Sequence, residues 1–307
     1  MMLPSWLKQK KPSLGKSIAV NNIIKSHGLN TVCQSAKCPN IFECFAKGTA
    51  TFMILGDACT RHCRFCSVKK ETPQPLSSDE SKKVADACLK MKLKHVVITS
   101  VTRDDLSDGG ASVFYDTIIE VRQACSGVTI EVLTPDFQGN QTSIRQVVSA
   151  KPDIFNHNIE TVSRLYPGIR SDAHERSAPY PHDGHRGASG RPEADYRRSL
   201  KLLAYVKELN PMMRTKSGLM LGLGEEENEV MAALKDLRAV DCDMVTIGQY
   251  LRPSLSAGTV EVTRFIPPEE FESYRAKASE MGFKAVASGP FVRSSYMAEE
   301  LGLKFSC

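Results

Sequence analysis

The sequence predicts an α/β protein built on a partial (β/α)6 barrel of the TIM type, with an N-terminal and a C-terminal extension. Short β-branched runs alternate with amphipathic stretches of helical period, which is typical of right-handed βαβ units in a parallel sheet. The length of 307 residues suffices for one large α/β domain or two smaller ones. A doubly wound sheet is the rival arrangement, but no glycine-rich phosphate turn follows the first expected strand.

The expected elements begin after Lys47. Six strands are expected at residues 49–56, 94–101, 128–135, 152–160, 213–222 and 243–250, with a seventh candidate at 284–290. Helices are expected at residues 79–92, 111–125, 139–150, 195–209, 226–239 and 268–281. Helix starts are expected at Ser78 and at Pro267–Pro268, because acidic residues follow in the first turn. The polar segment 171–190, rich in Pro and Gly, breaks this rhythm, and we interpret it as a disordered insertion.

The composition is ordinary for a globular protein, with 41% hydrophobic and 24% charged residues. No apolar run approaches the ~18–20 residues that cross a bilayer. The N-terminus carries neither a signal-peptide pattern nor the Arg-rich pattern of a transit peptide, since the first arginine is Arg61. The sequence therefore predicts a cytoplasmic protein without a membrane partner.

Positive charge is concentrated near the N-terminus. Six lysines and no acidic residue precede Glu43. Such a block is interpreted either as a solvated, partly disordered arm or as a docking surface for an acidic partner. Nucleic acid is disfavoured as a partner because no aromatic residues are interleaved with the lysines.

Ten cysteines are present, and six of them lie between Val32 and Lys70 in two groups of three. In a reducing cytosol, such close spacing indicates metal binding or redox catalysis rather than disulfides. Cys88 and Cys125 lie in helical patterns and are interpreted as small buried apolar residues.

The second triplet, Cys59, Cys63 and Cys66, has the spacing C-x-x-x-C-x-x-C just after the first expected strand. Soft thiolates select zinc or iron–sulfur clusters. A 4Fe–4S cluster normally takes four cysteines, so a cluster held by three leaves one iron open to a small molecule.

The first triplet, Cys33, Cys38 and Cys44, would hold either a second cluster or a structural zinc ion. Zinc in a structural site takes four protein ligands. His27 is the nearest candidate for the fourth ligand in the sequence.

The second triplet after a barrel's first strand resembles the radical S-adenosylmethionine superfamily. Both triplets in this order, joined by GTATFMILG, resemble the lipoyl synthase family more closely, and the resemblance extends from about residue 17 onward. Further matching stretches are VVITSVTRDDLSDGGA (96–111), PDIFNHNIETV (152–162), TKSGLMLGLGE (215–225), TIGQYLRPS (246–254) and GPFVRSSY (289–296).

The resemblance implies an enzyme that inserts two sulfur atoms, at C6 and C8 of a protein-bound octanoyl-lysine, to give the lipoyl group. It implies S-adenosylmethionine and two 4Fe–4S clusters as cofactors. The second triplet would hold the cluster that generates 5′-deoxyadenosyl radicals, and the first an auxiliary cluster that supplies sulfide. Ser294, the first serine of R-S-S-Y, would be the auxiliary cluster's fourth protein ligand, although a helix cap is the ordinary interpretation of such a serine.

The expected contacts with S-adenosylmethionine are less specific. Asn158 and Glu160 resemble a motif that biotin synthases use near the adenosyl ribose, and a polar strand end is the competing interpretation. Gly109 and Gly110 are expected near the methionine carboxylate through backbone amides. Lys216 is a candidate contact for substrate or cofactor. No catalytic residue beyond the cluster ligands is expected.

The family's partners are an octanoylated lipoyl carrier and an electron donor. The carrier would be the glycine-cleavage H protein or the lipoyl domain of a 2-oxoacid dehydrogenase, and the donor a flavodoxin or ferredoxin. Three regions follow: an extension with the auxiliary-cluster cysteines (1–48), the radical barrel (49–290) and the segment with the serine ligand (291–307). The insertion departs from the family pattern, which puts contacts by Arg170 or Arg191 in doubt.

Three alternatives stay open. Another radical enzyme that inserts sulfur, of the biotin synthase kind, is disfavoured by a triplet upstream of the radical motif. A two-cluster electron-transfer protein would form no 5′-deoxyadenosine. A zinc-stabilised binding module would contain neither iron nor sulfide.

Overall fold

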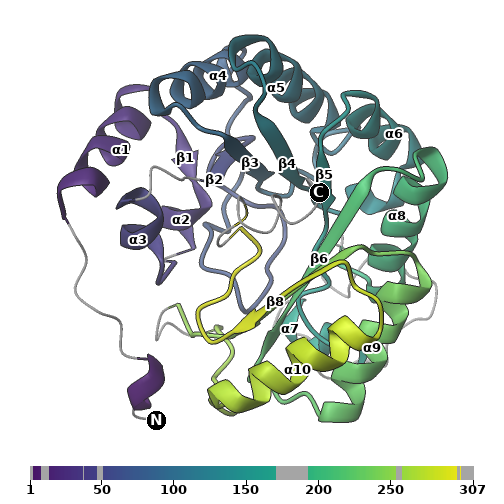
Figure 1. Ribbon diagram of the computed structural model, residues 1–307. Coiled ribbons are helices and arrows are strands. Elements are labelled where there is room, and N and C mark those ends of the chain that lie inside the picture. Colours follow the sequence, from purple (N-terminus) through teal and green to yellow (C-terminus); the bar gives the residue numbers. More distant parts are fainter. Residues whose placement is uncertain are drawn as a thin grey trace.

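Eight strands form one sheet in chain order, curved into an open barrel (Figure 1). The computed structural model describes residues 3–7, 14–36, 38–46, 51–170, 193–253, 258–295 and 298. The strands are β1 (Asn30–Thr31), β2 (Thr51–Ile54), β3 (His95–Ser100), β4 (Thr129–Leu133), β5 (Ile154–Asn156), β6 (Arg214–Leu221), β7 (Met244–Gln249) and β8 (Ala285–Gly289). β1 pairs antiparallel with β2, and all later neighbours pair in parallel. Because β1 and β8 are the two edges of the sheet, the partial barrel predicted from the sequence is confirmed, and the seventh candidate strand is part of it.

Helices cover the outer face of the sheet (Figure 1). They are α4 (Glu80–Met91), α5 (Ala111–Ala124), α6 (Gln141–Ser149), α8 (Tyr196–Leu209), α9 (Glu227–Ala239) and α10 (Pro268–Glu280). Short turns η2 (Phe137–Gly139), η3 (Ser163–Leu165) and α7 (Tyr166–Ile169) lie between them. α4 begins after the N-cap Asp79 and α10 at Pro268, close to the starts predicted from acidic first turns. No helix in the described ranges is long and apolar enough to cross a membrane.

The main hydrophobic core lies between the strands and these helices. Phe52, Ile98 and Ile130 of neighbouring strands are fully buried there, together with Phe114 of α5. Because strand side chains alternate between the two faces, every second residue of the same strands points to the inside of the barrel. The strand side chains that do not pack in this core therefore point into the interior of the barrel.

A buried polar layer closes the interior below the carboxyl ends of the strands. Lys216 Nζ lies 2.9 Å from Glu131 Oε1, and His95 Nε2 lies 3.3 Å from Glu131 Oε2. Burial alone would raise the pKa of Glu131, but the charges and hydrogen bonds of Lys216 and His95 bring this pKa to about 2. Asn156 Nδ2 donates to the same carboxylate. Thus Lys216 is held in a buried ion pair in the floor of the barrel.

The N-terminal extension is folded from Leu14 onward in the described part of the chain. α1 (Leu14–Ser26), α2 (Val32–Ser35) and α3 (Ile41–Ala46) follow the short turn η1 (Ser5–Leu7). Val20 and Ile24 of α1 pack against Cys33 and Phe45 in a small separate core. The part of the arm from α1 to α3 is therefore folded, because β-branched residues of α1 bury one face.

Several expectations concern parts of the chain outside the described residues. These parts are the insertion at 171–190, Arg191, and Tyr296 of the R-S-S-Y sequence with the residues after it, apart from residue 298. Cys88 and Cys125 are buried free thiols, as expected for small core residues, and Cys242 is buried as well.

Candidate functional site

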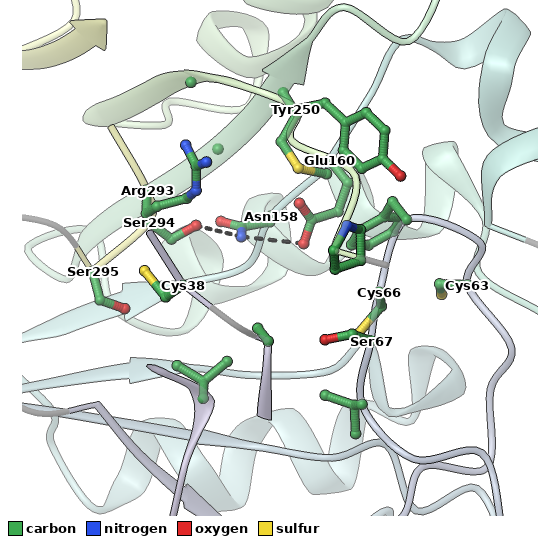
Figure 2. Close-up of a pocket in the computed structure, with 18 of the residues that line it drawn as sticks. Cys38, Cys63, Cys66, Ser67, Asn158, Glu160, Tyr250, Arg293, Ser294 and Ser295 are labelled. Carbon is green, nitrogen blue, oxygen red and sulfur yellow. Dashed lines mark hydrogen bonds between the residues drawn. The ribbon is translucent and has the colours of Figure 1, made fainter. Parts of the chain in front are cut away.

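A cavity of about 960 Å³ lies at the carboxyl ends of the strands, where a (β/α) barrel carries its chemistry. Residues from the ends of β3 to β7, from the N-terminal extension and from the segment after β8 line it. Figure 2 shows part of this lining. All seven expected cluster ligands are among the lining residues: Cys33, Cys38, Cys44, Cys59, Cys63, Cys66 and Ser294.

The second triplet lies in a loop that closes on itself after β2. Ala58 and Lys69 form a parallel β-bridge at its base, and the amide of Cys59 donates to Lys69 O at 2.8 Å. At the far end, the amide of Cys66 donates to Cys63 O at 3.2 Å. The loop between these contacts, called the radical loop below, consists of residues 58–69.

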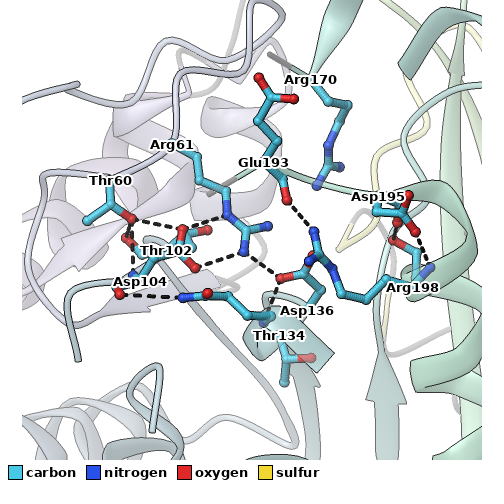
Figure 3. A network of polar contacts seen from close by, with 12 residues as sticks. Thr60, Arg61, Thr102, Asp104, Thr134, Asp136, Arg170, Glu193, Asp195 and Arg198 are labelled. Atoms are coloured by element: carbon cyan, nitrogen blue, oxygen red, sulfur yellow. Dashed lines mark hydrogen bonds and ion pairs between the residues drawn. The ribbon is translucent and has the colours of Figure 1, made fainter. Parts of the chain in front are cut away.

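Arg61 anchors the radical loop to the barrel (Figure 3). Its Nε lies 2.7 Å from Asp104 Oδ2, and its Nη2 lies 2.6 Å from Asp136 Oδ1. Arg198 Nε binds the second oxygen of Asp136 at 2.8 Å. Burial alone would raise the pKa of Asp136, but the charge and hydrogen bonds of Arg61 hold it well below its usual range. Ion pairs with two buried carboxylates therefore attach the radical loop to the barrel.

Arg170 lies beside the other side of the radical loop. Its guanidinium lies 5.8 Å from the ring centre of Phe65 and 5.4 Å from that of Tyr166. Its backbone oxygen faces Cys63 Sγ at 3.8 Å. Arg170 lines the cavity, and its buried Nε has no hydrogen-bond partner among the described residues. A cation with this free donor suits an anionic ligand group.

The first triplet is carried by α2, α3 and the turn between them. Thr31 caps α2 through its hydroxyl, which accepts from the amide of Gln34. The amide of Cys38 donates to Cys33 O at 3.0 Å, and the amide of Cys44 donates to Asn40 O at 2.9 Å. These local contacts bring three thiols to one side of the cavity.

Two hydrogen bonds join the first triplet to the rest of the site. Ser67 Oγ of the radical loop donates to Ser35 O at 2.6 Å. Asn40 Nδ2, which is buried, donates to Phe291 O at 2.6 Å, a contact across 251 residues of chain. The segment from Pro290 to Ser295, called the C-terminal segment below, is thereby attached to the N-terminal extension.

Two glycines make room for the C-terminal segment. A Cβ on Gly248 of β7 would collide with the carbonyl oxygen of Val292. A Cβ on Gly218 of β6 would lie 2.5 Å from Thr246 Oγ1 and 3.3 Å from Ser294 Oγ. A side chain at Gly248 would therefore displace the segment, and one at Gly218 would displace Thr246 first.

Asn158 and Glu160 follow β5 and point into the cavity (Figure 2). Asn158 Nδ2 donates to Ser294 Oγ at 2.5 Å and to Glu160 Oε1 at 3.2 Å. Glu160 adopts a left-handed φ of 66°, which is unusual for a residue with a side chain. Its bridge to Leu219 of β6 holds this conformation. Burial raises the pKa of the Glu160 carboxyl.

Burial affects four of the six thiols of the two triplets. Burial is the main cause that raises the pKa of Cys33 to about 11 and that of Cys66 to about 12. The pKa values of Cys38 and Cys63 are raised for the same reason. A cation at the site stabilises the thiolate and removes this penalty. A donor set of six thiols with a single hydroxyl fits iron–sulfur clusters, which prefer soft ligands.

In the described part of the chain, no three His, Cys, Asp or Glu side chains form a group that could hold one metal ion. A cubane cluster spreads its ligands over several iron atoms, so it does not require such a convergence. His27, the candidate fourth ligand of a zinc site, is absent from the cavity lining and is bonded to Ile23 O and Lys90 Nζ.

The other residues that were expected to contact cofactor or substrate do not line the cavity. Gly109 and Gly110 are absent from its lining, and their amides donate to Leu106 O and to the carboxylate of Asp108. They serve the start of α5, so the expected contact with the methionine carboxylate is not supported. Lys216 is likewise absent from the lining, because Glu131 holds it in the floor.

Sequence reasoning did not single out Arg61, Asp104, Asp136 or Asn40. Arg61 lies between the cysteines of the second triplet, and that position was the available signal. Its two acidic partners follow different strands and are 43 and 75 residues away, so spacing alone could not join them.

Comparisons with known proteins agree with this geometry. The family model described as Radical SAM superfamily matches residues 53–237. Streptococcus suis SuiB bound to S-adenosylmethionine has a similar fold, with a TM-score of 0.52 and 10% identity over 78% of this chain and 51% of that one. The FeFe-hydrogenase maturase HydG from Carboxydothermus hydrogenoformans gives a TM-score of 0.51 and 12% identity over 83% of this chain and 65% of that one. The fold and the cysteine loop thus define a radical S-adenosylmethionine enzyme, a class that uses a 4Fe–4S cluster and S-adenosylmethionine.

Relatives that match nearly the whole chain show which family within this class it resembles. A lipoyl synthase from Caldanaerobacter subterraneus subsp. tengcongensis is 53% identical over 96% of this chain and 95% of its own length. A lipoyl synthase from Pyrobaculum calidifontis is 48% identical over 99% of this chain and 97% of its own length. The chain belongs to the lipoyl synthase family.

Proposed function

We propose that this enzyme inserts two sulfur atoms, at C6 and C8 of an octanoyl-lysine carried by a protein, and so forms the lipoyl group. The observation that carries the proposal is the meeting of both cysteine triplets and Ser294 around one cavity. Cys59, Cys63 and Cys66 hold one 4Fe–4S cluster with an open iron for S-adenosylmethionine. The first triplet and Ser294 hold the auxiliary cluster.

The cluster of the radical loop would supply the electron that cleaves S-adenosylmethionine to a 5′-deoxyadenosyl radical, which takes a hydrogen atom from the substrate and leaves as 5′-deoxyadenosine; the auxiliary cluster would supply the sulfur. The chain's own residues hold these groups and exclude water. Arg61 fixes the radical loop through Asp104 and Asp136, and the C-terminal segment covers the strand ends. Asn158 and Glu160 contact the adenosyl ribose, and Arg170 offers its free Nε to an anionic group of the ligand.

The substrate is an octanoylated lipoyl carrier, either a glycine-cleavage H protein or the lipoyl domain of a 2-oxoacid dehydrogenase. A flavodoxin or ferredoxin supplies electrons. The division into an extension up to residue 48, a barrel to residue 290 and a C-terminal segment is part of this proposal. A cytoplasmic location follows from the need to keep the cluster thiols reduced.

The test is an anaerobic single-turnover reaction on an octanoyl-lysine peptide, followed by mass spectrometry. The wild type is expected to give product with two sulfurs together with 5′-deoxyadenosine. Cys38→Ala should still form 5′-deoxyadenosine but insert no sulfur, whereas Cys63→Ala should form neither. Cys125→Ala, outside the cavity, is the control. Full sulfur insertion by Cys38→Ala would overturn the proposal.

The same samples separate the competing functions. An electron-transfer protein with two clusters forms no 5′-deoxyadenosine with S-adenosylmethionine. A zinc-stabilised module contains no iron or acid-labile sulfide after anaerobic purification. A radical enzyme for a different acceptor forms 5′-deoxyadenosine but leaves the octanoyl peptide unchanged.

A further inference from the structure

The side chain of Asn158 joins two parts of the site that come from distant segments of the chain. Its Nδ2 donates to Ser294 Oγ at 2.5 Å and to Glu160 Oε1 at 3.2 Å, as the dashed lines in Figure 2 show. A carboxamide nitrogen has two hydrogens, so both bonds can be made at the same time. The three side chains therefore form a continuous hydrogen-bonded chain from the C-terminal segment to the end of β5.

Glu160 sets the orientation of the Asn158 carboxamide. If the amide were reversed, its oxygen would face the carboxylate oxygen of Glu160, and two acceptors would oppose each other. In the observed orientation, Asn158 Oδ1 is buried and has no hydrogen-bond partner in the described part of the chain. The interactions on the nitrogen side thus outweigh the cost of leaving the oxygen unpaired.

The backbone around this chain of bonds is built to hold it in place. A Cβ on Gly218 would lie 2.9 Å from Asn158 Oδ1 and 3.3 Å from Ser294 Oγ, so β6 leaves space for both side chains. Glu160 is held with a φ of 66° by hydrogen bonds of its backbone to Gly218 and Met220 of the same strand. A left-handed residue that neighbouring structure holds in place at a ligand cavity indicates a functional constraint.

The geometry points to a second role for Asn158 besides its proposed contact with the ribose: it couples the S-adenosylmethionine site to the auxiliary-cluster ligand Ser294. This inference rests on the proposed function, which gives Ser294 and Glu160 those two roles. When Ser294 is fixed, Asn158 keeps the Glu160 carboxylate in the orientation that accepts ribose hydroxyls. When S-adenosylmethionine occupies Glu160, the carboxamide in turn keeps Ser294 Oγ in place. Such coupling is reciprocal, so removal of either end must weaken the other.

The test is a double-mutant cycle on equilibrium binding of S-adenosylmethionine to the anaerobically reconstituted enzyme. Ser294→Ala and Asn158→Ala are each expected to raise Kd about fivefold or more. The double variant should bind no more weakly than Asn158→Ala alone, because the connection is already lost. Asn158→Asp should behave like Asn158→Ala, since a carboxylate keeps the shape but cannot donate to Ser294. Ser295→Ala, next to the ligand in the same segment, is the matched control and should bind as the wild type does.

The Mössbauer spectrum of the auxiliary cluster provides a second readout that is independent of activity. Addition of S-adenosylmethionine should change this spectrum in the wild type and leave it unchanged in Asn158→Ala. The coupling would be overturned if the two single effects on Kd simply multiply in the double variant. It would also be overturned if Ser295→Ala raised Kd as much as Ser294→Ala does. If the wild type inserts sulfur and the cycle is multiplicative, only the coupling fails. If the wild type forms no lipoyl group, the proposed function fails instead.

Discussion

Nη2 of Arg61 lies 2.6 Å from Oδ1 of Asp136, and this ion pair joins the radical loop to the turn after β4. Both side chains are almost fully buried. Because an uncompensated charge in such a place is costly, removal of one partner costs more than the intact pair contributes. The radical loop is therefore attached to the barrel by buried ion pairs.

Asp136→Asn is expected to lower the free energy of unfolding by about 3 kcal/mol or more, because a neutral amide replaces the carboxylate between Arg61 and Arg198. Urea unfolding of the cluster-free protein at pH 7 measures this change. Asp57→Asn is the matched control, since the Asp57–Lys69 pair is exposed and contributes little. Equal stability of the two variants would contradict the anchoring role of Arg61.

Gly248→Ala should distinguish the two proposed cluster sites. The added methyl group collides with the carbonyl of Val292 and displaces the C-terminal segment, whereas the radical loop lies elsewhere. We expect the reconstituted variant to keep about half of the iron of the wild type, as for loss of one of two four-iron clusters. Iron and sulfide analysis after anaerobic reconstitution measures the effect.

Gly289→Ala provides the control for Gly248→Ala in the next strand. Its Cβ would meet Val292 Cγ2 at 3.5 Å, an ordinary contact, so its iron content should equal that of the wild type. If Gly248→Ala also binds the full amount of iron, the C-terminal segment does not supply a ligand.

His157 should make the fold sensitive to mild acid. Burial lowers the pKa of His157 to about 4 from 6.5, against the opposing charge of Asp136. Between these pH values the unfolded chain binds a proton that the folded chain does not, so stability falls as the pH falls. The total loss attributable to this residue is about 3 kcal/mol.

His157→Gln should flatten this part of the stability profile. Urea unfolding of the cluster-free protein, measured at intervals from pH 6.5 to pH 4, gives the slope of the unfolding free energy against pH. The two ring nitrogens contact Thr134 O and Ser199 Oγ at 2.9 Å each, so the variant also tests whether an amide can replace both contacts. A slope equal to that of the wild type would mean that other groups cause the acid sensitivity.

The barrel could be predicted from the sequence because its signals are local. The strands after β1 were expected from short β-branched runs, and each outer helix has an amphipathic period and, at Asp79 and Pro268, a recognisable start. The two-residue strand β1 was not predicted. The helix α1 was missed because its lysines and lack of acidic residues resemble a solvated arm. Its burial depends on Cys33 and Phe45, which the local pattern does not include.

Residues of the candidate site could be predicted in two cases only. They either lie close together in the sequence or belong to a stretch that resembles the family. The cysteine spacings named six residues of the cavity lining, and the resemblance added Ser294. The contact of Asn40 with Phe291 spans 251 residues and depends on how the sheet curves. Gly109 and Gly110 resembled an anion-binding turn, but their left-handed φ values serve the N-terminus of α5 instead.

On the ribosome, the parts of this site emerge in a fixed order, with the first triplet at the start and Ser294 only after β8. The chain from Asn40 to Phe291, a separation of 251 residues, takes roughly 13 to 50 seconds to synthesise at ~5–20 residues per second. During this interval three cysteines of the nascent chain lack the segment that covers them. Completion of the site is therefore a late event in synthesis, because the contact between Asn40 and Phe291 can form only after β8 has been made.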